Sequence, residues 1–97
     1  MDIVVVYDIA GTDDPAGAAR LRNLSDVCSA YGHRVQYSVF ECRVSPAGFV
    51  SLQDEISRAI DHNQDNVILY RIVGDMQPNR TSLGVDTEHA LGETWVL

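Results

Sequence analysis

Hydrophobic side chains recur with two different periods along the chain, and these periods predict strands that alternate with helices. A continuous β-branched run over residues 2–9 is typical of a central β-strand. Apolar residues then recur at helical spacing over residues 15–31 and again over 46–60. Each helical segment starts with a capping side chain followed by a proline. These pairs are Asp14-Pro15 and Ser45-Pro46. We expect two amphipathic helices in these positions.

The segment 33–44 reads as extended chain with a break in its phase. Its apolar residues alternate on one parity up to Val39 and on the opposite parity from Phe40 onward. The break indicates a bulge, a sharp bend, or two strands that meet near residues 36–38. We expect Gly32, just before this segment, to close the first helix in a left-handed conformation.

The order of these elements, with a further β-rich run at residues 67–73, predicts the fold class. It is α+β, a ferredoxin-like βαββαβ sandwich whose antiparallel sheet carries both helices on one face. Residues 1–74 form the domain, and residues 75–97 form a polar tail. We expect two short apolar pieces of the tail, Leu83–Val85 and Trp95–Leu97, to pack on this domain or on a partner.

The composition fits a single small folded domain of 97 residues with a net charge of −7. All seven basic residues are arginines, and an acidic balance argues against strong, unaided nucleic-acid binding. Arginine also suits bidentate phosphate contacts, so the composition leaves both interpretations open. The apolar runs are far shorter than a membrane-spanning helix. We expect a cytoplasmic protein with no membrane partner.

Asp8 is the first candidate for chemistry, since a charged residue follows directly on the apolar run of the first strand. Its carboxylate either caps or solvates the strand end, or it binds a metal ion. Mg²⁺ usually takes one or two carboxylates together with water, and no second carboxylate stands nearby in the sequence. A two-fold dimer would supply one by bringing two copies of Asp8 together.

The remaining candidates have a simple structural interpretation beside the functional one. We expect Ser38 to be a structural hydroxyl at the strand bend, because no base is placed to activate it. Tyr7, Tyr37 and Phe40 are expected in the core, with base stacking as the alternative. Three arginines are either ordinary surface residues or a phosphate clamp: Arg20, Arg22 and Arg34.

Two sequence motifs carry a resemblance to a known family. Tyr7-Asp8-Ile9 and Tyr31-Gly32-x-Arg34-Val35-Gln36-x-Ser38-Val39-Phe40-Glu41-Cys42 together resemble the CRISPR-associated protein 2 family. The resemblance implies a ferredoxin-like homodimer with facing sheets and a C-terminal strand that crosses to the partner. It implies a metal-dependent endonuclease acting on single-stranded RNA or duplex DNA, and an adaptor between two dimers of the CRISPR-associated integrase on protospacer DNA.

The same resemblance assigns roles to individual residues. Asp8 would be the catalytic and metal-binding residue, with one Mg²⁺ or Mn²⁺ shared by the Asp8 pair across the dimer. The nucleic-acid-binding residues would be Arg20, Arg22 and Arg34, and the supporting residues would be Tyr7, Ser38 and Phe40. The chain departs from the family at residues 11–15, where an acidic loop replaces a basic helix start.

Three hypotheses therefore stand. The chain is a metal-dependent endonuclease of CRISPR adaptation in a prokaryotic cytoplasm, or a non-catalytic adaptor bridging integrase dimers and protospacer DNA. The third hypothesis is an interaction module without a nucleic-acid role, since this architecture hosts many functions.

Overall fold

The structure of the protein is a computed structural model, and it describes residues 1–85. Four strands and two α-helices follow one another in the order expected from the sequence. They are β1 (Asp2–Asp8), α1 (Pro15–Ser29), β2 (Gly32–Gln36), β3 (Val39–Arg43), α2 (Pro46–Ala59) and β4 (Asn66–Ile72), followed by the short 3₁₀ helix η1 (Gln77–Asn79). The strands form one antiparallel sheet in the order β2-β3-β1-β4. The ferredoxin-like prediction is confirmed.

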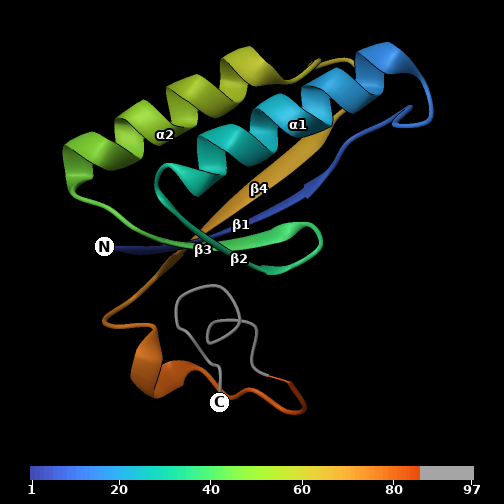
Figure 1. Ribbon diagram of the computed structural model, residues 1–97. Coiled ribbons are helices and arrows are strands. Elements are labelled where there is room, and N and C mark those ends of the chain that lie inside the picture. The colour runs from blue at the N-terminus through green and yellow to red at the C-terminus, as the bar shows by residue number, and fades with distance from the viewer. Residues whose placement is uncertain (86–97) are drawn as a thin grey trace.

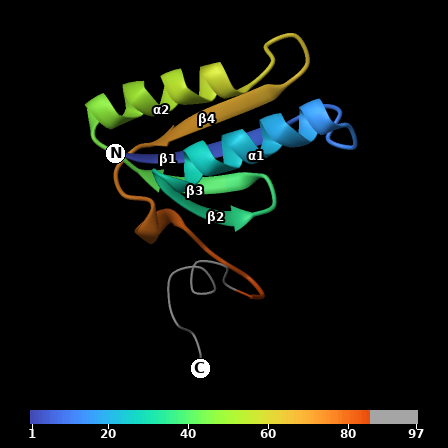
Figure 2. The ribbon, with the colours of Figure 1, turned by 45° about the horizontal axis from the view of Figure 1, so that its top comes forward.

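The molecule has two layers, with both helices on one face of the sheet (Figure 1). A second view shows the same arrangement, with residues 73–85 passing to the side of the sheet away from the helices (Figure 2). Alternate residues of β1 point to the helices, and these residues, Ile3, Val5 and Tyr7, are buried in the core. The other residues of β1, which are Asp2, Val4, Val6 and Asp8, lie on the face of the sheet that the helices do not cover. We call this face the open face.

Both helix starts are built as the sequence predicts. Asp14 accepts a hydrogen bond from the backbone N–H of Ala16 at 3.0 Å, and Ser45 accepts one from Gly48 at 3.0 Å. A proline occupies the first turn of each helix, where its missing N–H has no partner to lose. Helix side chains from α1 and α2 then fill the core around β1 and β3.

The break in phase marks a strand junction, because residues 37 and 38 form a turn between β2 and β3. A register shift between Arg34 and Gln36 adds an irregularity to β2 as well. The prediction for Gly32 is wrong: α1 ends at Ser29 with a right-handed cap at Ala30. Gly32 instead starts β2, where a Cβ atom would lie 2.1 Å from the carbonyl oxygen of Glu41. Glycine is needed there for close backbone approach.

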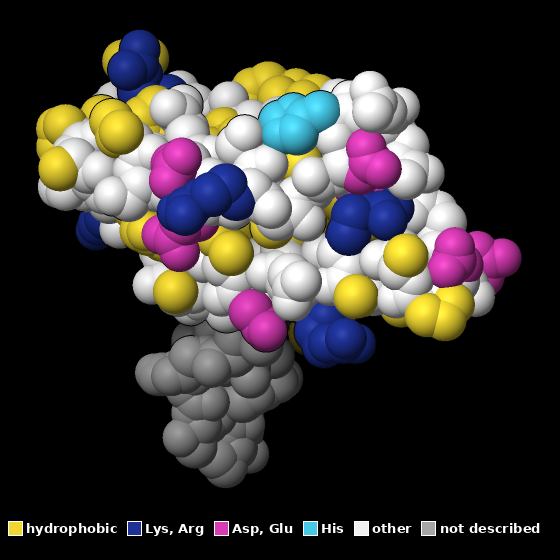
Figure 3. Space-filling view, turned by 90° about the horizontal axis from the view of Figure 1, so that it is seen from above, with side chains coloured by type: hydrophobic (Ala, Val, Ile, Leu, Met, Phe, Trp, Pro, Cys, Tyr) yellow, Lys and Arg dark blue, Asp and Glu magenta, His cyan; other side chains and the backbone are white. Residues whose placement is uncertain are grey.

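Basic and acidic side chains are interspersed over the helical side of the molecule (Figure 3). No helix among residues 1–85 is long and apolar enough to cross a membrane. The division at residue 74 stays a prediction, and Trp95–Leu97 lie outside the described residues.

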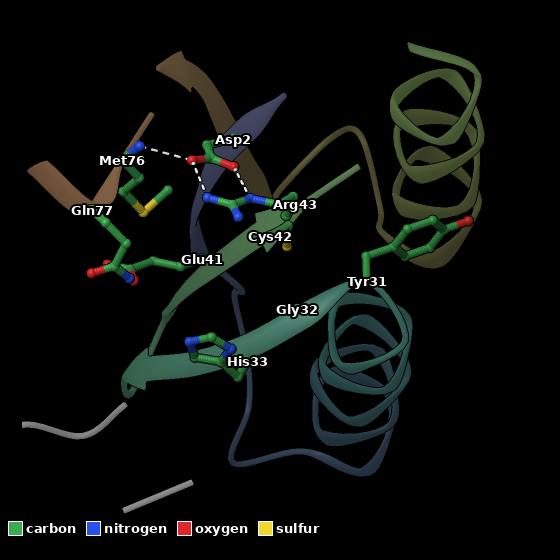
Figure 4. A pocket seen from close by; sticks show the side chains of 9 residues that line it. All are labelled: Asp2, Tyr31, Gly32, His33, Glu41, Cys42, Arg43, Met76 and Gln77. Carbon is green, nitrogen blue, oxygen red and sulfur yellow. Dashed lines mark hydrogen bonds and ion pairs between the residues drawn. The ribbon is translucent and has the colours of Figure 1, made fainter. Parts of the chain in front are cut away.

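The buried carboxylate of Asp2 ties the segment after β4 to the sheet. It accepts hydrogen bonds from Arg43 at 2.7 and 3.0 Å and from the backbone N–H of Met76 at 2.7 Å (Figure 4). Farther along this segment, Arg80 forms an ion pair with Glu41 at 3.1 Å. Residues 76–80 therefore contact the open face of their own sheet beside β3.

The hydrogen bond from Arg43 lowers the pKa of Asp2 most, and the hydrogen bond from Met76 lowers it next most. Together they outweigh burial, which raises the pKa, and bring it to about 2. A depressed pKa stabilises the fold above the ordinary value of 3.8, and the contribution disappears as the pH falls toward 2. We expect Asp2→Asn to unfold at lower denaturant concentration than wild type at pH 6. The difference should shrink between about pH 4 and pH 2. Urea titrations across that range would measure it, and a difference that stays constant would contradict this role of Asp2.

Candidate functional site

Asp8 lies at the carboxyl end of β1, opposite Asn66 of β4. Its side chain is exposed, whereas its neighbours Tyr7 and Ile9 are buried. Since side chains alternate along a strand, Asp8 shares the open face with Val4 and Val6. The carboxylate is thus presented to solvent at one end of an apolar surface.

A single chain offers an incomplete metal site at this position. No group of three or more His, Cys, Asp or Glu side chains among residues 1–85 could hold a metal ion. One exposed carboxylate fits a divalent cation that keeps most of its waters, and a second copy of Asp8 would match the one or two carboxylates that Mg²⁺ usually takes. A pair of Asp8 carboxylates from two chains would fit Mg²⁺ or Mn²⁺ better than one carboxylate does.

The open face carries apolar side chains that nothing in residues 1–85 buries. Val6 pairs in register with Val39 on one side and Ile68 on the other, and Val4 pairs with Tyr70. The exposed fractions are 42% for Ile68 and 54% for Tyr70. Apolar side chains on an open sheet face make this surface a candidate interaction site.

Tyr7 connects the end of β1 to the β2–β3 turn. Its backbone N–H donates to the carbonyl of Ser38 at 3.1 Å, and its hydroxyl donates to the carbonyl of Tyr37 at 3.4 Å. Burial raises the pKa of Tyr7 against the opposing effect of Arg34, so its hydroxyl stays protonated and acts as a donor. The turn therefore lies next to the strand end that bears Asp8.

Phe40 lies between Tyr7 and Arg34. Its ring stacks on Tyr7 with a centroid distance of 6.2 Å, and the Cζ atom of Arg34 lies 5.2 Å from its centroid. Arg34 also donates from Nη2 to the hydroxyl of Ser25 on α1 at 2.5 Å. Phe40 is 1% exposed, so it contributes to this site through Arg34 and Tyr7.

Arg20 is held in an internal ion pair with Asp65. Its Nε atom lies 2.8 Å from the Asp65 carboxylate, with side-chain exposures of 18% and 0%, and its Nη2 donates to the carbonyl of Ala10 at 2.9 Å. Burial alone would raise the pKa of Asp65, but hydrogen bonds from Arg20 and from the N–H groups of Asp61 and Ala10 hold that pKa below its ordinary value. This cluster fixes the chain just after β1 against the start of β4.

Ion pairing divides the seven arginines into two groups. Four of them pair with carboxylates of the described chain: Arg20 with Asp65, Arg43 with Asp2, Arg58 with Asp54 and Arg80 with Glu41. The other three, Arg22, Arg34 and Arg71, have no ion pair with a residue of the range 1–85. Arg22 and Arg34 line one surface pocket together, beside the β2–β3 turn.

Tyr7, Ser38, Phe40 and Arg34 lie at the same end of the sheet as Asp8. Asp8 is on the open face, whereas Tyr7 and Phe40 face the helices and Arg34 contacts Ser25 of α1. The roles assigned to them, and to Arg20 and Arg22, stay predictions. Tyr37 is a correction, because it is 78% exposed in the turn rather than in the core. Asp65 was missed as the partner of Arg20. No local signal in the sequence points to this pair, because the two residues are 45 positions apart.

The fold and this end of the sheet define a small ferredoxin-like domain with an exposed carboxylate at the end of its central strand. Residues 1–80 match the family described as CRISPR associated protein Cas2. A CRISPR-associated endoribonuclease Cas2 of Chlorobaculum tepidum is 36% identical over 97 residues, which is 100% of both chains. A CRISPR-associated endonuclease Cas2 of Halalkalibacterium halodurans is 39% identical over 72 residues, which is 74% of both chains.

The crystal structure of Streptococcus pyogenes Cas2 agrees with this fold. Its TM-score is 0.77 at 40% identity, and the match covers 87% of this chain and 100% of that one. The chain belongs to the CRISPR-associated Cas2 family.

The different environments of Arg20 and Arg22 lead to a testable difference in stability. Arg20→Ala leaves the buried carboxylate of Asp65 without its cation, so we expect the melting temperature to fall by several degrees. Arg22→Ala removes an exposed side chain of the same helix without an ion pair, so it should change the melting temperature little. Thermal unfolding of the two variants, matched in residue type and helix, would measure this. Equal melting temperatures would contradict the structural role of Arg20.

Proposed function

We propose that this chain is a divalent-metal-dependent endonuclease of CRISPR adaptation whose catalytic unit is a homodimer. The observation that carries the proposal is that exposed Asp8 lies on the open face, at the end of the uncovered apolar surface formed by Val6, Val39 and Ile68. A second copy that covers this surface about a two-fold axis brings its own Asp8 toward the first. The names of the relatives, endoribonuclease and endonuclease, support nucleic acid as the substrate.

In this dimer the two Asp8 carboxylates would hold one Mg²⁺ or Mn²⁺, which when bound would supply a water of lowered pKa and positive charge beside the scissile phosphate. Tyr7 and Phe40 shape this end of the sheet from the core side. Tyr7 fixes the β2–β3 turn relative to β1 through its backbone and its hydroxyl. Arg22 and Arg34 are the cations available at this end to a phosphate backbone. Single-stranded RNA and duplex DNA are both candidate substrates.

A second candidate function is a non-catalytic adaptor between integrase dimers and protospacer DNA. The charge of the chain favours it, because the net charge is −7 and four of the seven arginines are occupied by internal ion pairs. An integrase partner would then supply most of the positive charge that duplex binding needs. The two roles are compatible, since an adaptor dimer can keep a metal site.

Asp8→Asn tests the catalytic proposal directly. The substitution keeps the size of the side chain and removes its charge, so we expect metal-dependent cleavage to fall roughly 100-fold or more. Labelled single-stranded RNA and duplex DNA would be incubated with Mg²⁺, with Mn²⁺ and with chelator. The matched control is Asp13→Asn, an exposed carboxylate of the following loop, which should cleave like wild type.

Cleavage that survives Asp8→Asn would contradict the assignment of the metal to Asp8. A folded wild-type dimer that cleaves neither substrate would contradict the nuclease proposal and leave the adaptor as the function.

Ile68→Glu tests the dimer. A carboxylate at the centre of the apolar surface must lose its hydration when a second copy covers it, so we expect the variant to be monomeric and inactive. Sedimentation velocity would give the mass of both forms. Val50→Glu is the control, because Val50 is equally apolar and 64% exposed but lies on α2. Dimerisation of Ile68→Glu at wild-type strength would contradict the use of the open face.

A further inference from the structure

A surface pocket lies between α1 and the β2–β3 turn, on the edge of the sheet next to the end of β1. Its volume of about 310 Å³ falls at the lower end of the range of small-ligand sites, roughly 300–1,000 Å³. The residues that bear on its chemistry are Thr12, Arg22, Ser25, Asp26, Arg34 and Tyr37. They come from the loop after β1, from α1 and from the β2–β3 hairpin.

The charge of this pocket is unusual for such an acidic chain. Arg22 and Arg34 lack an ion pair with any described residue, although the chain carries twice as many acidic as basic side chains. One carboxylate, Asp26, lines the pocket with them, so the two cations outnumber the anions there. The pocket therefore favours an anionic group.

Arg34 has no ion pair with a carboxylate among residues 1–85. Its Nη2 donates to the neutral hydroxyl of Ser25, and its Cζ lies over the ring of Phe40. A guanidinium is always charged and carries five donors, so an anion would complete its coordination. Phosphate suits it because guanidinium can bind two phosphate oxygens at once.

Tyr37 supplies the second half of a nucleotide site. Its ring is 78% exposed at the rim of the pocket, whereas the other aromatic side chains of this end, Tyr7 and Phe40, are buried. Two hydrogen bonds from Tyr7 to the carbonyls of Ser38 and Tyr37 hold the turn in place. An exposed ring on a fixed turn is a surface on which an unpaired base can stack.

We propose that this pocket binds one nucleotide of a single-stranded polynucleotide, with its base stacked on Tyr37 and its phosphate held by Arg22 and Arg34. The inference rests on the proposed function in that it requires a nucleic-acid ligand. It adds a subsite, and it favours single-stranded over fully paired substrate, because a paired base cannot leave its own stack without cost. The subsite lies at the same end of the sheet as Asp8.

The test compares protein and ligand changes in one cycle. A short fluorescein-labelled single-stranded RNA and the same strand with stable abasic units would be titrated in chelator, so that neither is cleaved. Fluorescence anisotropy gives the dissociation constants for wild type, Tyr37→Ala and Tyr37→Phe. Because Tyr37 is exposed, its truncation leaves the core intact, and circular dichroism would check this.

We expect wild type and Tyr37→Phe to bind the RNA alike, and Tyr37→Ala to bind it at least roughly 5-fold more weakly, the lower limit for loss of one stacked base. All three should bind the abasic strand equally. Arg22→Gln and Arg34→Gln should weaken both strands and reduce the salt dependence, since they lose phosphate contacts.

Unchanged RNA affinity in Tyr37→Ala, or an equal loss for both strands, would overturn the stacking site while leaving the nuclease proposal in place. Wild type that does not distinguish RNA from the abasic strand would overturn it as well. A wild type that binds neither strand nor duplex DNA, and cleaves none with metal present, would instead contradict the proposed function itself.

Discussion

The alternation of side chains along β1 is the constraint on which the rest of the structure depends. One parity of this central strand packs into the core beneath α1 and α2, and the other parity faces away from both helices. Residues 1–85 contain two α-helices, and both cover the same face of the sheet (Figure 1). The open face is either exposed to solvent or covered by another surface. Its apolar side chains Val6, Val39 and Ile68 favour a face that is covered.

This constraint also explains why the proposed site rests on a single carboxylate in each chain. Asp8 is the last residue of β1, and its side chain lies on the open face. Because the carboxylate is exposed to solvent, its charge needs no partner within the chain. In the proposed dimer the same alternation places two such carboxylates on facing sheets. Neither chain alone contains the site, and the apolar surface and the acidic end belong to one interface.

The internal ion pairs decide which arginines are available for the proposed nucleic-acid contacts. Arg20 and Arg22 are two residues apart on α1, yet one is tied to buried Asp65 while the other is exposed. The two arginines cannot be distinguished from the sequence, because the partner of Arg20 is 45 residues away. A salt bridge between residues so far apart in the sequence forms only through the tertiary structure. The local sequence around residue 65 therefore does not predict it.

The elements themselves were predictable because their signals are local. Asp14-Pro15 and Ser45-Pro46 mark both helix starts, and the change in phase near residue 37 locates the β2–β3 junction. Two predictions from local sequence, for Gly32 and Tyr37, are wrong because tertiary structure determines the environment of these residues. Gly32 is required by the close approach of β3 rather than by a helix cap, and Tyr37 is placed by the turn outside the core. The proposed metal site is not a local signal either, since the proposal needs a second chain.

The most direct measurement of the central claim is the stoichiometry of Mn²⁺ binding, followed by electron paramagnetic resonance as the metal is titrated into the protein. If two copies of Asp8 share one ion across the open face, binding saturates at one ion for every two chains, and this site is absent from Asp8→Asn. Saturation at one ion per chain, or the same site in the variant, would contradict the shared Asp8 pair.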